Sequence, residues 1–365
     1  MKLLFRTFEN KDAKAVVDLF NTCFEAYRTL EEWIWMYLRM PGFDPSGILL
    51  AEDQGTGQIV GSLVLSEGEI SVNGRRQVVG WIDDVSTSPN WRGRGIAGHL
   101  MSMAISESNK RGYSAMFLYA NPSGRGARIY RRLGFKDVHY SYIHGKSGRL
   151  RSAIRNLPLP MNIAAPIMVV VSGISSRRCR LAKSQARTRK LDCSDKTECE
   201  HYLDAMNDSL QRIPLFHPYS RESWNWLIRD APNSISPAAR YIEKSGRIIC
   251  GAEASVFRMR FFGRTFNTWV INDLFASNDL QSPQKETYVR SVIEDLTQDG
   301  EMRDCSWHMA LASQFDTAIV KSLRPCGYFS FISATFMCLP LRHEFSLPPF
   351  EDPWYCWKQH MIGVP

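Results

Sequence analysis

The residues whose types and spacing most clearly suggest chemistry form the run Arg92-Gly93-Arg94-Gly95-Ile96-Ala97. This run follows an apolar segment of strand length and precedes a helical pattern that continues to Arg111. Glycines at a strand-to-helix turn let backbone N–H groups converge, and the start of the helix adds free donors and the positive end of its dipole. The run therefore predicts a cradle for a pyrophosphate group, to which the Arg94 side chain could add charge.

Groups suited to proton transfer lie close to this run in the sequence. Asp83 and Asp84 are adjacent acids on an otherwise apolar strand, where alternation sends them to opposite faces. A carboxylate is a candidate for a general base, and a phenol is a candidate for a general acid. Tyr130 lies on a predicted helix, where an aromatic residue more often belongs to the core.

These features together resemble the GNAT acyltransferase superfamily, whose core signature is Arg or Gln, two residues, Gly, one residue, then Gly or Ala. The residues that fill this signature are Arg92, Gly95 and Ala97. A second landmark of the family is an Asn that ends the next strand, followed by a helix that carries a Tyr and closes in Gly-Phe. Here those residues are Asn121, Tyr130, Gly134 and Phe135.

The resemblance implies that an acyl-CoA lies between two splayed parallel strands, with its pyrophosphate on the glycine loop. Backbone groups of Val85 and Thr87 would bind the pantetheine arm and the thioester, and Tyr130 would protonate the CoA sulfur. The implied cofactor-binding residues are Val85, Ser86, Thr87, Arg92, Gly93, Arg94, Gly95, Ile96, Ala97, Asn121 and Ser123. No metal is implied.

A dinucleotide-binding fold is the competing interpretation of a glycine turn. Gly93, Gly95 and Gly98 have the glycine spacing of that fold. However, they follow a predicted hairpin rather than a first buried parallel strand. The sequence therefore favours an acyl-CoA site.

The elements that position these residues follow from periodicity and turn signals. A helix is predicted over 12–23, and Thr29 with Glu32 forms a capping box that starts another. The remaining predicted elements are strands at 48–51, 59–65, 69–72, 77–85, 115–120 and 138–143, and helices at 97–111 and 125–133. We expect an α/β (α+β) fold: a mixed, mostly antiparallel sheet with splayed parallel central strands, flanked by helices and duplicated.

The second half of the chain repeats the first at low fidelity. Trp81-Ile82-Asp83-Asp84-Val85 resembles Val270-Ile271-Asn272-Asp273-Leu274, after which neither glycine nor arginine follows before Pro283. Asp84 therefore has a counterpart in a copy without the loop, which suggests a structural role, and Asp83 is the better candidate for the base. We predict a catalytic module at 1–147, a connecting segment at 148–190 and a degenerate GNAT-like module at 191–365.

Composition limits the partners. A formal charge of +8 and a pI near 9.0 favour an anionic ligand, but no zinc-finger spacing or basic-aromatic block predicts nucleic-acid binding. Nine scattered cysteines without a CxxC pair fit reduced thiols in a cytoplasmic protein. We expect no secretion signal, no membrane span, and a monomer or a homodimer.

The sequence thus predicts an N-acyltransferase that moves an acyl group, expected to be acetyl, from CoA to the primary amine of a small molecule. A protein, peptide or aminoacyl acceptor is the alternative, as is a module that binds acyl-CoA without turnover. Ordered water or the terminal carboxylate of Pro365 are other possible bases, whereas His99 is expected to be packed or exposed. Aromatic residues of the first helices are candidates for the acceptor pocket: Phe24, Tyr27, Trp33, Trp35 and Tyr37.

Overall fold

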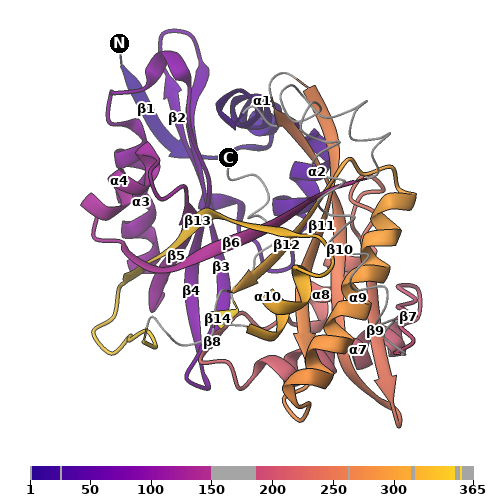
Figure 1. Ribbon diagram of the computed structural model, residues 1–365. Coiled ribbons are helices and arrows are strands. Elements are labelled where there is room, and N and C mark those ends of the chain that lie inside the picture. The colour runs from indigo at the N-terminus through magenta and orange to yellow at the C-terminus, as the bar shows by residue number, and fades with distance from the viewer. Residues whose placement is uncertain are drawn as a thin grey trace. The chain divides into compact units, whose positions relative to one another are not determined.

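The protein divides into two compact units (Figure 1). The computed structural model describes residues 2–24, 27–148, 186–261, 264–313, 317–349 and 354–355. Unit 1 comprises residues 1–140, 333–350 and 360–365, and unit 2 comprises residues 141–332 and 351–359. Most of the predicted connecting segment, at 149–185, and Pro365 lie outside the described residues.

The sheet of unit 1 is mixed and mostly antiparallel, as predicted. Its order is β1 (Leu3–Thr7), β2 (Ile48–Asp53), β3 (Gln58–Val72), β4 (Arg75–Thr87), β5 (Ala115–Ala120) and the end of β13 (Phe329–Pro340). β4 and β5 run parallel, and the other neighbours run antiparallel. β3 is one long strand where the sequence predicted two, and the Gly68 backbone between the two predicted strands lies close to the Trp81 ring.

The α-helices of unit 1 begin within one residue of the predicted positions. They are α1 (Ala13–Phe24), α2 (Leu30–Trp33), the π-helix η2 (Ile34–Leu38), α3 (Ile96–Lys110) and α4 (Arg125–Arg132), with short 3₁₀ turns η1 (Asn10–Asp12), η3 (Pro45–Gly47) and η4 (Pro89–Trp91). The predicted capping box of Thr29 and Glu32 is present at α2. Ile96, Leu100 and Ala104 of α3 belong to the same buried cluster as Leu63 and Leu65 of the sheet, and the helix lies against β2, β3 and β4.

The sheet of unit 2 has the same plan. Its order is the end of β6 (Lys136–Ser147), then β12 (Trp307–Ser313), β11 (Arg264–Ala276), β10 (Arg247–Phe261), β9 (Ala238–Lys244) and β7 (Arg189–Lys190). The remaining elements are α7 (Lys196–Leu210), β8 (Leu215–Phe216), α8 (Arg221–Arg229), α9 (Ser282–Met302), α10 (Thr317–Leu323) and β14 (Trp354–Tyr355). β11 and β12 are the parallel pair.

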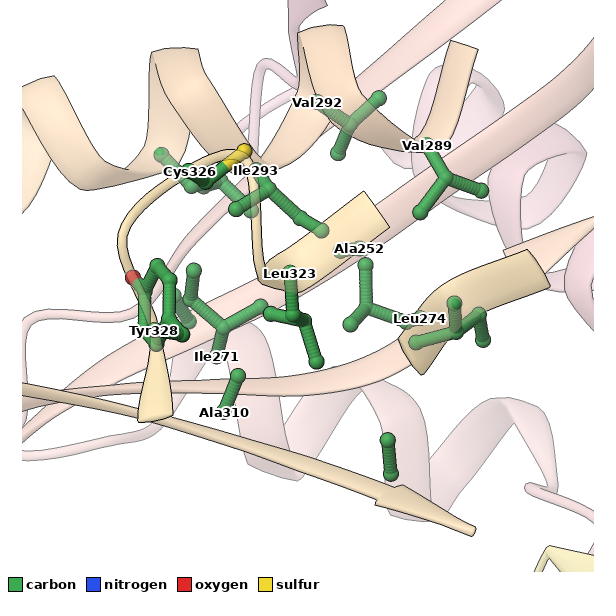
Figure 2. Close-up of a cluster of buried hydrophobic side chains, with 14 of the residues drawn as sticks. Ala252, Ile271, Leu274, Val289, Val292, Ile293, Ala310, Leu323, Cys326 and Tyr328 are labelled. Carbon is green, nitrogen blue, oxygen red and sulfur yellow. The ribbon is translucent and has the colours of Figure 1, made fainter. Parts of the chain in front are cut away.

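The core of unit 2 forms where α9 lies along β9, β10 and β11 (Figure 1). Figure 2 shows Val289, Val292 and Ile293 of this helix directed at the sheet, with Leu323 and Tyr328 beside them. These side chains are almost completely buried. The degenerate module therefore has a full apolar core of its own.

Each sheet is completed by a strand from the other half of the sequence. Residues Thr335–Pro340 of β13 pair with β5 in unit 1, and residues Ser141–Ser147 of β6 pair with β12 in unit 2. Phe336 of β13 stacks on Phe117, with ring centroids 5.1 Å apart. The units therefore differ from the predicted modules at 1–147 and 191–365, because residues 333–350 lie in unit 1.

Across the described part of the chain, no helix combines the length and the apolar character needed to cross a membrane.

Candidate active site

The glycine loop is open, and the helix that follows it is packed directly on β3. Gly93 and Gly95 have φ angles of +84° and +77°, in the left-handed region that favours glycine, and no atom lies within 4 Å of a Cβ built on either. Gly95 is the N-cap of α3. A Cβ on Gly61 of β3 would lie 2.5 Å from Ile96 Cγ2, so the bare glycine lets the start of α3 sit directly on the sheet.

The arginines of the loop have different neighbours. The Arg94 guanidinium lies over the Trp91 ring, 4.7 Å from its centroid. Arg92 Nε donates to the carbonyl of Thr87 at 3.4 Å. Both side chains remain exposed, so both are accessible to an anionic ligand.

The strands β4 and β5 separate next to this loop. Their parallel pairing runs from Gly80 with Met116 to Ile82 with Leu118, although β4 continues to Thr87. The edge of β4 from Asp83 to Thr87 that faces β5 is therefore open to another chain of hydrogen-bonding groups. This is the splay that the sequence predicted.

Two hydroxyl groups at this open edge are suited to a polar ligand. Ser86 Oγ and Thr87 Oγ1 are buried and have no hydrogen-bond partner among the described residues. The carbonyl of Thr87, by contrast, accepts from Cys23 Sγ at 3.2 Å. A buried polar atom without a partner is costly, so a bound pantetheine arm would satisfy groups that the protein leaves unmet. The residues at this edge therefore fit an acyl-CoA.

A β-bulge in β4 separates the two acids. Ser62 pairs with Ser86 and Val64 pairs with Asp83, so β4 has one extra residue here. Asp84 lies in the bulge with a φ of +50°, in the left-handed region. The prediction that simple alternation sends Asp83 and Asp84 to opposite faces therefore does not hold, because the bulge interrupts the alternation.

Asp84 forms an ion pair with Arg28, and both side chains are almost completely buried. Tyr37 of η2 lies in the same cluster: burial, with Asp84 and Asp83 nearby, raises the pKa of its phenol. Sequence reasoning missed Arg28. Its only signal is its place immediately before the Thr29 cap, where the repeat has Tyr219 before the Ser220 cap of α8.

Tyr130 lies on α4, with its ring turned back over Gly126. It is 7% exposed and belongs to the core cluster of unit 1. Burial raises the pKa of the phenol, so Tyr130 carries its proton at neutral pH. Its position is thus compatible with both the core and the acid that the sequence predicted.

Asn121 and Ser123 shape the turn between β5 and α4. Asn121 Oδ1 accepts from the Ser123 backbone N–H at 3.1 Å and from its hydroxyl at 3.0 Å. Gly124 N donates to the Asn121 carbonyl at 2.9 Å. These contacts position the start of α4, and through it Tyr130.

The aromatic residues proposed for the acceptor pocket divide by burial. Trp33, Trp35 and Tyr37 are buried, and of these Tyr37 is the one beside the acids at the bulge. Tyr27 is 46% exposed. His99 is exposed, and its ring centroid lies 3.9 Å from that of Phe5.

Unit 2 repeats the scaffold without the loop. Ser277 N donates to Ile249 O as Ser88 N donates to Val60 O, so Leu280 corresponds to Trp91. The four residues Arg92–Gly95 then precede α3, whereas Gln281 alone precedes α9. Pro283 in the first turn of α9 further removes one backbone donor.

The counterparts of the proposed catalytic residues also differ. Asp273 lies in an equivalent bulge of β11, with a φ of +49°, and Asn272 corresponds to Asp83. Phe135 N donates to Tyr130 O as Tyr328 N donates to Leu323 O, so a leucine replaces Tyr130. The repeat found in the sequence is therefore present in the structure, and it lacks the loop, the first acid and the tyrosine.

Comparison with known proteins agrees with this division. The family described as acetyltransferase (GNAT) domain matches residues 5–138. Mycothiol acetyltransferase of Thermobifida fusca is 31% identical over 110 residues, which are 29% of this chain and 33% of that protein. An uncharacterized N-acetyltransferase of Methanocaldococcus jannaschii is 28% identical over 140 residues, 36% of this chain and 61% of its own length. The chain thus spans less than two thirds of each of these relatives.

Solved structures match nearly the whole chain in fold. N-myristoyltransferase of Saccharomyces cerevisiae with bound myristoyl-CoA and inhibitors has a TM-score of 0.68 at 12% identity, over 93% of this chain and 80% of that one. A second structure of that enzyme with bound myristoyl-CoA has a TM-score of 0.67 at 13% identity, over 92% and 78%. At this identity the likeness concerns the fold alone.

Proposed function

We propose that the protein, whose residues 5–138 match the GNAT acetyltransferase domain, transfers an acyl group from acyl-CoA to the primary amine of a small molecule. Acetyl-CoA is the expected donor, and unit 1 would carry the only site. The observation that supports this most is the occurrence of the open glycine loop beside splayed strands in unit 1, while unit 2 keeps the splay and has lost the loop.

We assign binding to backbone and side-chain groups of unit 1. The N–H groups of Gly93 to Ala97 would bind the pyrophosphate, with Arg92 and Arg94 adding charge. The edge of β4 from Val85 to Thr87 would bind the pantetheine arm, and the turn at Asn121 and Ser123 would close the site. When bound, acyl-CoA supplies a thioester as the activated acyl group.

Two side chains would handle protons. The Asp83 carboxylate would accept the proton of the amine, directly or through water, as its nitrogen attacks the acyl carbon. The Tyr130 hydroxyl would give its proton to the sulfur as the C–S bond breaks. Asp84 would remain in its ion pair with Arg28.

Binding can be tested with a substitution that does not destabilise the loop. An acidic residue in the first turn of a helix is favourable to the helix, but Ala97→Glu would repel a pyrophosphate there. We expect isothermal titration with acetyl-CoA to show binding by wild type and none by A97E. Gln284→Glu adds the same charge in the first turn of α9 and is the matched control. Absence of binding by wild type, or equal binding by A97E, would refute the proposal.

The acceptor can be determined by thiol release. The proposal expects CoA release with small primary amines. Since N-myristoyltransferase shares the fold, peptides with a free N-terminus form the second arm of the panel. Release with peptides alone would replace the small-molecule acceptor, and binding without release to any amine would indicate a non-catalytic module.

A further inference from the structure

Arg28 joins the β4 bulge to the segment between α1 and α2. Its side chain is 8% exposed and that of Asp84 is 7% exposed, so this ion pair is shielded from water. The guanidinium also lies over the Phe20 ring, 3.8 Å from its centroid. A buried arginine is expensive unless it is paired, so the site is built to keep this charge.

The backbone that presents Arg28 is fixed by a clamp. Asn21 Nδ2 donates to Arg28 O at 2.8 Å, and Arg28 N donates to Asn21 Oδ1 at 2.8 Å. The two bonds tie both the N–H and the carbonyl of Arg28 to α1. They hold it regardless of what its side chain does.

Unit 2 contains the same clamp around a different side chain. Asn207 Nδ2 donates to Tyr219 O at 2.9 Å, and Tyr219 N donates to Asn207 Oδ1 at 3.3 Å. Tyr219 Oη then donates to Asp273 Oδ2 at 3.0 Å. The clamp, the bulge and the bulge aspartate are therefore duplicated, and a neutral donor replaces the cation.

The type of donor in each unit correlates with the number of acids next to the bulge. On β4, Asp83 is next to Asp84, and the partner of Asp84 is Arg28. On β11, Asn272 is next to Asp273, and the partner of Asp273 is Tyr219. The bulge aspartate accepts from a cation in unit 1, at Asp84, and from a neutral hydroxyl in unit 2, at Asp273. Of the two bulges, the cation is at the one where a second carboxylate, Asp83, precedes the bulge aspartate on the same strand.

Unit 2 has a second carboxyl group as well, that of Glu253, but its environment is different. Glu253 of β10 is buried and accepts hydrogen bonds from Ser255 and Asn272. Burial raises its pKa to about 8, so it is neutral at pH 7. In that unit the charge is removed by protonation, which would be of no use to a base.

We propose that Arg28 is a positioning residue of the acyl-transfer site: its guanidinium neutralises Asp84 and thereby keeps the neighbouring Asp83 ionised at neutral pH. This inference rests on the proposed function only in giving Asp83 the role of base. Among the described residues, Arg28, from the segment before α2, interacts with Asp84, and Tyr37, from η2, interacts with both acids. Like charges on adjacent carboxylates oppose ionisation, and a cation removes that cost.

The test places the side chain found in unit 2 at the corresponding position of unit 1. Arg28→Tyr keeps a donor for Asp84 but removes the cation, and Arg28→Lys keeps the charge. In the double variant R28Y/D84N the net charge of the cluster is −1, as in wild type, because one cation and one anion are removed. Thermal unfolding and titration with acetyl-CoA check that each variant is folded and binds.

Two readouts follow the pH dependence. The acidic limb of kcat/KM should move to higher pH by about one pH unit in R28Y, and return toward wild type in R28K and in R28Y/D84N. The ¹³Cγ resonance of Asp83, assigned with D83N, should titrate in the same order. This second readout needs no turnover, so it tests Arg28 even if the proposed activity fails.

An Asp83 titration that is the same in R28Y and wild type would overturn the inference. A double variant displaced as far as R28Y would also overturn it, since a purely structural ion pair gives that result.

Discussion

The support of the glycine loop by Gly61 gives a quantitative prediction. A Cβ at this position would lie 2.5 Å from Ile96 Cγ2, 3.2 Å from Ala51 Cβ and 3.3 Å from Leu100 Cδ1. Carbon atoms prefer a separation of about 3.5–4.0 Å, so the start of α3 has to move by about 1 Å in Gly61→Ala. Overpacking of this kind costs about 1–3 kcal/mol of stability.

The same movement should weaken acyl-CoA binding. A shift of about 1 Å takes an N–H···O contact out of hydrogen-bonding range. One lost hydrogen bond to a charged phosphate costs about 1.5–3 kcal/mol, which is about a 10- to 150-fold rise in Kd. Isothermal titration with acetyl-CoA measures this rise directly.

Gly68→Ala is the matched control. Its Cβ would also meet a side-chain atom at 2.5 Å, here Trp81 Nε1, but in the middle of β3, whereas Gly61 lies under the loop. We expect a comparable loss of thermal stability and an unchanged Kd. The reasoning is refuted if G61A binds as tightly as wild type despite a lower Tm, or if G68A loses affinity to the same extent.

Two further predictions concern proton-bearing groups. Tyr130→Phe should lower kcat by about 10²-fold or more while the Kd for acetyl-CoA stays the same; Tyr328→Phe in unit 2, which loses only its bond to Thr297, should leave kcat unchanged. An unaltered kcat would remove Tyr130 from the reaction. The pKa of Glu253 is about 8 in the folded state, against 4.5 when unfolded. Its contribution to stability is therefore full below pH 4.5 and is lost as pH rises toward 8. Glu253→Gln should therefore gain stability over wild type by up to about 1.4 kcal/mol per pH unit between those values; melting curves whose difference is the same at pH 5 and pH 8 would contradict this.

Local chemistry was predictable from the sequence. The Thr29 capping box and the strand-to-helix turn at Gly95 depend on residues close together in the chain, and both are present. The parallel pair β4 and β5 followed from the order of strands and helices, and its splay was implied by the family resemblance.

What could not be predicted depends on distant residues or on a single irregularity. The bulge at Asp84 changes the face of every later side chain on β4, and alternation alone contains no sign of it. Arg28 reaches an acid 56 positions away, and its signal was only its place before a cap. The assignments of Asp83, Tyr130 and the loop as site residues remain predictions.

The completion of unit 1 by β13 has a consequence for the order of events during synthesis. Residues Thr335–Pro340 pair with β5 in its sheet, so β5 has only one partner strand, β4, until residue 340 has left the ribosome. Domains usually fold in order from the N-terminus. Here the unit that is translated first is completed late, and a chain that stops before residue 335 lacks a strand of the unit that carries the loop.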